Sequence, residues 1–266
     1  MADEPFDLGL LGGHRALDLL VDEILGAGEE AMRLYRSGAA DRARMKQDNS
    51  PVTEADEAVE HRLREFVRKQ FPDAGFLGEE TGAAGPEGSG TRFIVDPIDG
   101  TRAFIRGLPT WSILVGIEHA GEPVVGVALM PAAGDLFVGV CGAGSHANGR
   151  PVRLSTVAAL AQATVSHGGL AQFTGAEVAD ALPKLAEGTF TQRGFADFDG
   201  YRQLLLGRVD AMVDPGTTPW DLCAAAALTR AAGGRFTSLG GEESIYGGGG
   251  LASNGLVHDA LVALLR

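Results

Sequence analysis

The chain has 266 residues, of which 45% are hydrophobic and 21% charged, values typical of a soluble globular protein. Its 22 Lys and Arg against 35 Asp and Glu residues leave a net charge of −13, which disfavours roles in binding nucleic acid or an anionic membrane. A chain this acidic that handles phosphate is expected to need metal cations. An acidic start and the lack of an apolar run of ~20 residues predict no signal peptide, no membrane span and a cytoplasmic location.

The first half of the chain predicts two amphipathic helices followed by strands. Apolar residues recur at helical spacing over 17–35 and over 54–70, where Thr53 is a suitable N-cap before three acidic residues. Residues 81–90 are rich in glycine and predict a flexible loop. The predicted strands are 92–95, 112–118, 124–130 and 136–140, with a hairpin turn at 119–123.

The second half alternates between strands and helices. We expect helices layered on two sheets, with an N-terminal lobe of residues 1–152 and a C-terminal lobe of residues 153–266. The predicted elements are strands near 163–166 and 211–213, helices around 176–182, 198–206, 220–232 and 258–265, and a short strand before the last helix.

Carboxylates cluster at the ends of these predicted elements. Asp96 and Asp99 stand three residues apart across a proline-containing turn and can point at one site, to which the carbonyl of Ile98 adds another oxygen. Hard divalent cations such as Mg²⁺ prefer oxygen ligands of this kind. Gly100 and Thr101 offer backbone N–H groups at a possible helix start, where a phosphate can bind.

Each motif also has a purely structural interpretation. Residues 96–101 could be a capped turn, Gly78-Glu79-Glu80 a solvated loop, and Asp221 after Trp220 a helix N-cap that stabilises the helix dipole. Their occurrence together, in this order, favours a functional site.

Taken together, the motifs resemble the signature blocks of the inositol monophosphatase superfamily. The matching segments are Lys46, 51–56 (PVTEAD), 76–80 (FLGEE), 94–101 (IVDPIDGT) and 219–221 (PWD), with further matches at 142–151 and 232–234. The resemblance therefore covers nearly the whole chain. It implies an α+β fold, a layered α-β-α-β-α sandwich, and the hydrolysis of a small phosphate monoester with two or three Mg²⁺ ions. It also implies a homodimer.

The resemblance implies a ligand set for the metals. Glu79, Asp96 and the carbonyl of Ile98 would hold a first ion. Asp96, Asp99 and Asp221 would hold a second, and a third, weaker ion would depend on Glu79 and water. Four carboxylates in one pocket repel one another unless cations neutralise them, so this set is consistent with a metal site.

The resemblance also implies catalytic roles. Thr101 with Asp56 would orient and activate the attacking water, and the amides of Gly100 and Thr101 would hold the phosphate. A pair of metals lowers the pKa of water and stabilises both the attacking and the leaving oxygen, so that no covalent intermediate is needed.

The segment 193–201 (RGFADFDGY) bears on the substrate. It is similar to the Gly-Asp-x-x-Gly-Tyr pattern of bacterial histidinol-phosphate phosphatases, with Ala196 in place of a glycine. The carboxylate of Asp197 could pair with the ammonium group and accept from the imidazole of L-histidinol phosphate, whereas inositol is a neutral polyol. Asp214, seven residues before Asp221, is placed like an acidic residue that contacts substrate in the family.

Several alternatives remain open from the sequence. Asp197 could merely cap the following helix, and Asp199 is expected on that helix's surface. The substrate could instead be inositol 1-phosphate or fructose 1,6-bisphosphate. A non-catalytic regulator that binds metal or phosphate is disfavoured, because every expected metal carboxylate and Thr101 are present.

Overall fold

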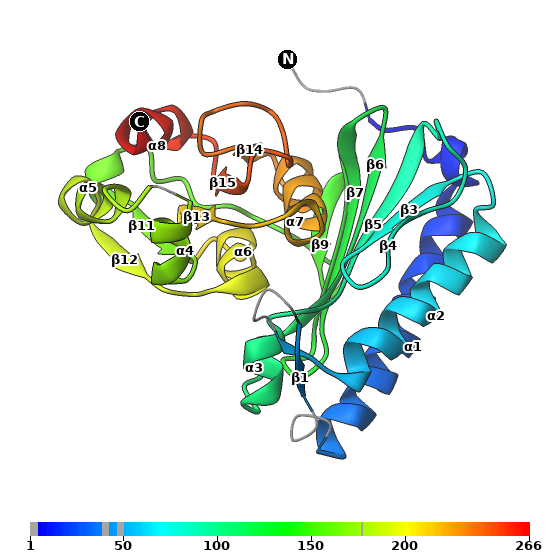
Figure 1. The fold of residues 1–266 in the computed structure, drawn as a ribbon. Helices are drawn as coiled ribbons and strands as arrows, with labels where there is room; N and C mark the ends of the chain where they lie inside the picture. Colours follow the sequence, from blue (N-terminus) through cyan, green and yellow to red (C-terminus); the bar gives the residue numbers. More distant parts are fainter. Residues whose placement is uncertain (1–4, 39–42, 47–50, 177) are drawn as a thin grey trace.

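The computed structural model describes residues 5–38, 43–46, 51–176 and 178–266. Residues 47–50, which belong to the polar segment before the second predicted helix, lie outside the described residues. Two sheets of eight and five strands alternate with three layers of helices (Figure 1). This is the layered α-β-α-β-α arrangement that the sequence predicts.

The first layer is a pair of long helices, both predicted from the apolar spacing. They are α1 (His14–Arg36) and α2 (Glu54–Gln70), and a short 3₁₀ helix, η1 (Leu8–Leu11), precedes them. Thr53 caps α2 as expected: its hydroxyl accepts from the Ala55 N–H at 3.1 Å, and the Asp56 carboxylate accepts from the Thr53 N–H at 2.8 Å. Leu20 and Val59 are among the residues with which the two helices cover one face of the large sheet.

The large sheet has the order β10-β9-β8-β7-β6-β5-β3-β4 and is antiparallel except between β3 and β5. Its strands are β3 (Gly75–Gly78), β4 (Gly82–Ala84), β5 (Thr91–Asp99), β6 (Ser112–His119), β7 (Glu122–Met130), β8 (Asp135–Val140), β9 (Gly144–Ala147) and β10 (Arg150–Pro151). A separate two-stranded sheet joins β1 (Arg44–Met45) to β2 (Pro51–Val52). The short helix α3 (Thr101–Ile105) follows β5.

Two predictions in this half need correction. Residues 82–84 of the predicted loop form the edge strand β4, because they continue a tight antiparallel hairpin from β3. The strand predicted at 92–95 runs on to Asp99, with a register shift between Asp96 and Asp99 against β6. The proline-containing segment is therefore an irregular strand end, where a proline is tolerated, instead of a turn.

The small sheet has the order β12-β11-β13-β15-β14. Its strands are β11 (Thr164–His167), β12 (Thr191–Arg193), β13 (Ala211–Pro215), β14 (Arg235–Thr237) and β15 (Gly249–Ser253). The helices around it are α4 (Leu170–Gly175), α5 (Ala181–Gly188), α6 (Asp197–Leu205), α7 (Pro219–Ala231) and α8 (His258–Leu265), with a 3₁₀ turn, η3 (Leu160–Gln162), before β11.

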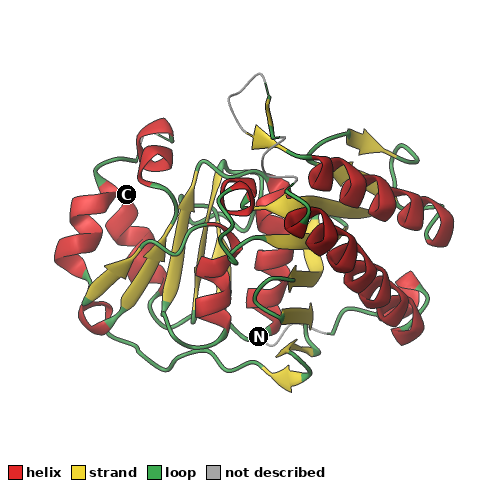
Figure 2. Ribbon diagram, turned by 90° about the horizontal axis from the view of Figure 1, so that it is seen from below, coloured by secondary structure: helices red, strands yellow, loops and turns green. Residues whose placement is uncertain are grey.

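The alternation of side chains along β13 explains why this sheet is covered on both faces. Met212 belongs to the core shared with α6 and α7, whereas Ala211 and Val213 belong to the core shared with α4, α5 and α8. Figure 2 shows the strands of both sheets with helices beside them. The helix predicted at 176–182 is wrong: α4 ends at Gly175 and α5 begins at Ala181, while residues 176 and 178–180 between them are not helical and residue 177 lies outside the described part.

Helix α7 lies between the two sheets and reaches the large one through glycines. A β-carbon on Gly116 of β6 would fall 2.4 Å from Cys223 Sγ and 2.7 Å from the Ala224 nitrogen. A β-carbon on Gly126 of β7 would fall 2.4 Å from the Ala224 carbonyl oxygen. Only glycine allows backbones to approach so closely. The start of α7 is thereby held against the sheet that carries Asp96 and Asp99.

Among the described residues, none of the helices is both long enough and apolar enough to cross a membrane. The division of the chain into lobes at residue 152 stays a prediction.

Candidate metal centre

Three aspartates from two elements converge where β5 ends and α7 begins. Asp96 and Asp99 come from the irregular end of β5, and Asp221 comes from the first turn of α7. One carboxylate oxygen from each lies within 4.8 Å of the others. The structure thus brings together three of the residues that the sequence singles out, and a single divalent cation could contact all three.

Hydrogen bonds on one oxygen fix each of these carboxylates. The donors are the Ile98 N–H to Asp96 Oδ1 (3.0 Å), Ser112 Oγ and the Phe198 N–H to Asp99 Oδ2 (2.6 and 2.8 Å), and the Thr218 N–H and Oγ1 to Asp221 Oδ2 (2.6 Å each). Anchoring through one oxygen sets the side chain in place while the carboxylate keeps further lone pairs for another ligand.

The electrostatics of the cluster call for a cation. Burial, followed by repulsion from Glu79, raises the pKa of Asp96 well above its usual value. Burial and repulsion from Asp197 raise the pKa of Asp99 in the same way. No lysine, arginine or histidine in the described part of the chain forms an ion pair with Asp96, Asp99 or Asp221. An all-oxygen donor set with uncompensated charge fits a hard divalent ion.

Glu79 enters the cluster from the other side, just after β3. Its carboxylate lies against Asp96 and contributes to the raised pKa of that residue. Lys46 Nζ donates to Glu79 Oε1 at 2.8 Å and to Glu80 Oε1 at 2.6 Å. Burial raises the pKa of Glu80 to about 7, and the hydrogen bond from Lys46 opposes that rise. The Glu79 carboxylate thus lies between the Lys46 ammonium group and the Asp96 carboxylate.

Lys46 and Glu60 both contact this turn. Lys46 matches a family segment, but sequence reasoning assigned a role to neither residue. Glu60 is fully buried on α2, and its carboxylate accepts from the N–H groups of Glu80 (2.7 Å) and Thr81 (2.8 Å). A β-carbon on Gly78 would fall 2.4 Å from Glu60 Cδ, so the turn packs directly onto that side chain. The sequence signal for Glu60 was its place one helical turn after Asp56, but this spacing alone does not predict that Glu60 binds the N–H groups of Glu80 and Thr81.

Thr101 and Asp56 meet beside the cluster. The Thr101 hydroxyl lies 3.2 Å from Asp56 Oδ1 and 3.0 Å from the Ile98 carbonyl oxygen, and its single proton can be donated to one of them at a time. Burial raises the pKa of Asp56 to about 6, although two hydrogen bonds from Thr53 lower it. Gly100, whose backbone is left-handed (φ 79°), is the N-cap of helix α3, which starts with Thr101. The four predicted residues Asp56, Ile98, Gly100 and Thr101 are therefore neighbours.

Asp197 and Asp214 border the same cluster. A β-carbon on Gly100 would lie 2.9 Å from Asp197 Oδ2, so this carboxylate rests on the Gly100 backbone. Burial and then repulsion from Asp221 raise the pKa of Asp197 to about 6. On β13, Asp214 is buried and accepts from the Tyr201 hydroxyl at 3.2 Å. Burial, then Asp221 and Asp197, raise its pKa well above the usual value.

The structure around Asp197 answers two questions left by the sequence: whether Asp197 caps the following helix, and whether Asp199 is exposed. Ala196 is the N-cap of α6, so Asp197 is the first residue of that helix and does not cap it. Asp199 is buried instead of exposed, because its Oδ1 accepts from Arg202 Nη1 (3.1 Å) and Gln203 Nε2 (2.9 Å). Both partners belong to α6, so Asp199 stabilises this helix.

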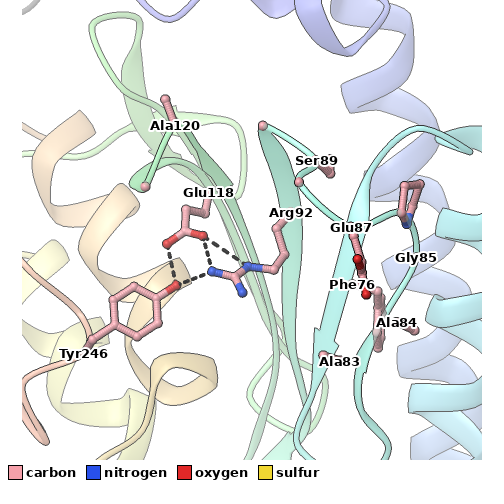
Figure 3. Close-up of a pocket in the computed structure, with 15 residues that line it drawn as sticks. Phe76, Ala83, Ala84, Gly85, Glu87, Ser89, Arg92, Glu118, Ala120 and Tyr246 are labelled. Carbon is pink, nitrogen blue, oxygen red and sulfur yellow. Dashed lines mark hydrogen bonds and ion pairs between the residues drawn. The ribbon is translucent and has the colours of Figure 1, made fainter.

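A cavity of about 710 Å³ lies elsewhere, near the beginning of β5. It is lined by the 83–90 segment and by Arg92, Glu118 and Tyr246, and none of the predicted site residues takes part. Figure 3 shows these three side chains pointing toward one another. Arg92 donates to Glu118 Oε2 and to the Tyr246 hydroxyl, which in turn donates to Glu118 Oε1. Each of these three side chains is hydrogen-bonded to the other two, so the acidic cluster is the better candidate for chemistry.

Comparison with known proteins agrees with the geometry. The family model described as "Inositol monophosphatase family" matches residues 15–266. A relative named histidinol-phosphatase, from Mycobacterium tuberculosis, is 37% identical and covers 94% of this chain and 98% of its own. A relative named fructose-1,6-bisphosphatase/inositol-1-monophosphatase, from Thermotoga maritima, is 33% identical over 81% of this chain and 82% of its own.

The fold is also found among solved structures. The crystal structure of the extragenic suppressor protein suhB from Bartonella henselae superposes with a TM-score of 0.85 at 27% identity, covering 95% of this chain and 98% of that one. The chain belongs to the inositol monophosphatase family and is a phosphoric monoester hydrolase.

Proposed function

We propose that the protein hydrolyses L-histidinol phosphate to L-histidinol and inorganic phosphate with Mg²⁺. The observation that carries this proposal is the pair of carboxylates, Asp197 and Asp214, at the border of the metal cluster. Asp197 raises the pKa of Asp99 and of Asp214 by charge repulsion, so the border of the metal cluster carries acidic groups beyond the proposed metal ligands. A substrate with an ammonium group and an imidazole would match such a pocket.

The residues of the chain divide the work of holding the metals. Glu79, Asp96 and the Ile98 carbonyl are proposed to hold one ion, and Asp96, Asp99 and Asp221 a second. A third, weaker ion would depend on Glu79. When bound, the ions supply a lowered pKa for water and charge stabilisation for the attacking and leaving oxygens.

Thr101 and Asp56 are proposed to orient the attacking water. The Thr101 hydroxyl can donate its proton to Asp56 Oδ1, which leaves its oxygen lone pairs available to accept from water. The water oxygen then bonds to phosphorus while the bond from phosphorus to the ester oxygen breaks. One proton of the water passes to the leaving alkoxide, and the other stays on the inorganic phosphate. Backbone N–H groups of Gly100 and Thr101 are proposed to hold the phosphate oxygens at the start of α3.

Hydrolysis of inositol 1-phosphate is the alternative, with fructose 1,6-bisphosphate behind it. The relative from Thermotoga maritima carries both of those activities in its name. The proposed metal ligands serve any of these esters equally, so they do not distinguish among them. Asp197 does, because a neutral polyol or sugar offers no cation to pair with its carboxylate.

Phosphate release with Mg²⁺ tests the substrate. L-histidinol phosphate and inositol 1-phosphate are compared at matched concentrations, with EDTA as the control that removes divalent ions. We expect a strong preference for histidinol phosphate. Asp197→Asn keeps the size of the side chain and should lower kcat/KM for histidinol phosphate by about 10²-fold, while the value for inositol phosphate changes little. Equal losses on both substrates would remove Asp197 as the selecting residue.

A homodimer and a cytoplasmic location stay predictions from the sequence. The mass of the protein in solution, measured by light scattering, tests the first of them.

A further inference from the structure

Three non-glycine residues of the described chain have a positive φ angle: Ala120 (51°), Asn148 (49°) and Asp197 (55°). Ala120 and Asn148 each precede a glycine with positive φ inside a two-residue hairpin turn, β6–β7 and β9–β10. Such turns require this backbone at both positions. Asp197 is in no hairpin, so its left-handed backbone needs another explanation.

The neighbours of Asp197 supply that explanation. The N–H of the next residue, Phe198, donates to Asp99 Oδ2 at 2.8 Å, on the same oxygen that accepts from Ser112. The Asp197 side chain meanwhile lies on Gly100, where a β-carbon would be 2.9 Å from its Oδ2. Residues 197 and 198 therefore contact residues 99 and 100 directly, one through a side chain and the other through a hydrogen bond.

Helix α6 has little freedom to adjust around this contact. The Phe198 ring is buried and packs edge-on against Phe137 of β8, with ring centroids 5.7 Å apart. At Gly200 a β-carbon would fall 2.4 Å from Met212 Sδ on β13, so the helix also packs directly on the small sheet. Because Gly100 holds the Asp197 side chain and α6 is fixed on both sides, a change in the backbone of residue 197 must be taken up by the 197–198 peptide, which carries the Phe198 N–H.

We infer that the left-handed backbone at Asp197 is a positioning device for Asp99. It aims the Phe198 N–H at Asp99 Oδ2 and so sets the orientation of a carboxylate in the metal cluster. Residue 197 then has two separable functions: its side chain faces the substrate, and its backbone tunes cation affinity. This inference rests on the proposed function in taking Asp99 as a metal ligand and in placing the Asp197 side chain toward the substrate.

A series of uncharged residues at position 197 separates backbone from charge. Asn and Gly adopt positive φ readily, Ala does so with strain, and Val strongly resists it. Mg²⁺ binding to the substrate-free protein, measured by calorimetry, should be similar for Asp197→Asn and Asp197→Gly. It should be weaker for Asp197→Ala and at least about 10-fold weaker for Asp197→Val than for Asp197→Gly. Equal affinities across the uncharged series would overturn the inference.

Ala120 provides a matched control for strain. It is exposed, has nearly the same φ, and lies in the β6–β7 turn away from the cluster. Ala120→Val should lower the melting temperature while Mg²⁺ affinity stays at the value of the unaltered protein. A drop in Mg²⁺ affinity for Ala120→Val as large as that for Asp197→Val would mean that general destabilisation accounts for the effect, and the inference would fail.

The Phe198 amide proton gives a readout independent of the metal. A hydrogen bond to a carboxylate moves an amide proton resonance downfield, so the signal should stay there in Asp197→Gly and move upfield in Asp197→Val.

Asp99→Asn separates the assignment of Asp99 as a metal ligand from the positioning role of residue 197. If it leaves Mg²⁺ affinity unchanged, the ligand assignment in the proposed function is wrong. If it abolishes binding while the uncharged series at 197 is flat, the proposed function stands and the positioning role is refuted.

Discussion

The two ends of β5 treat buried charge in opposite ways. At its beginning, Arg92 and Tyr246 satisfy the Glu118 carboxylate through hydrogen bonds. At its end, Asp96 and Asp99 are buried with other carboxylates and with no cationic side chain bound to them in the described residues. A charge that is neutralised within the chain serves the fold, whereas a cluster left unneutralised requires a cation from outside. The comparison therefore locates the chemistry better than cavity size does.

The largest difference is expected when one carboxylate at each end is made neutral. Asp99→Asn should lower phosphatase kcat by about 10³-fold or more, because a proposed metal ligand is lost from the site. Glu118→Gln makes the same chemical change at the other end and should leave kcat within about twofold of the unaltered protein. Phosphate release at saturating Mg²⁺ measures both. An active Asp99→Asn protein would contradict the proposed second metal site.

Removal of the Thr101 hydroxyl should have the next largest effect. Thr101→Val conserves shape but cannot donate to Asp56 or accept from water, so we expect kcat to fall by about 10²-fold or more. Thr101→Ser keeps the hydroxyl and should retain most of the activity. If the serine variant is as slow as the valine variant, the methyl group and not the hydroxyl is what the site needs.

The pH dependence of stability should reveal the unneutralised carboxylates at the end of β5. The pKa of Asp56 rises from 3.8 to about 6 on folding, and burial raises those of Asp96 and Asp99 in the same direction. The folded protein thus holds protons that the unfolded chain has released. This stabilisation is complete below pH ~4 and is lost as the pH rises through ~6.

In EDTA, the contribution of these groups should therefore lower the melting temperature by about 5 °C or more between pH 4.5 and 7.5, and Mg²⁺ should restore most of it at the higher pH. Differential scanning calorimetry measures the effect. Asp96→Asn, which removes one of the titrating groups, should flatten the profile. A profile that is already flat in EDTA would show that the carboxylates do not repel one another as their positions indicate.

The smallest effect is expected at the beginning of β5. Glu118→Gln leaves Arg92 without its carboxylate and should lower the free energy of unfolding by about 1 kcal/mol, because Arg92 is partly exposed to solvent. Tyr246→Phe removes only the hydroxyl and should cost less. Urea unfolding measures both, and Mg²⁺ affinity should be unchanged in each. Weaker Mg²⁺ binding in either variant would mean that the two ends of the strand are coupled.

Much of this arrangement could be predicted from the sequence because its signals are local. Apolar spacing and the Thr53 cap define α2, and alternating residues define β6 to β8. The convergence of Asp96 and Asp99 was expected for a different reason from the one found. In a regular strand, residues three apart point to opposite faces, and only the register shift at the end of β5 turns both toward one site.

The contacts that escaped prediction join segments far apart in the chain. The Phe198 N–H reaches Asp99 from 99 residues away, and Lys46 reaches Glu79 from 33 residues away. No periodicity or capping rule relates such residues, since their proximity depends on how the helices and sheets pack. The helix expected at 176–182 failed for a related reason: this segment mostly connects α4 to α5, and only its last two residues, Ala181 and Leu182, are helical.

The close approach of α7 to the large sheet has a consequence for how the site tolerates mutation. At Gly116 and Gly126, main-chain atoms of Ala224 and the side chains of Cys223 and Leu228 lie where a β-carbon would stand. A methyl group at either glycine would therefore push the start of α7, and with it Asp221, away from the sheet that carries Asp96.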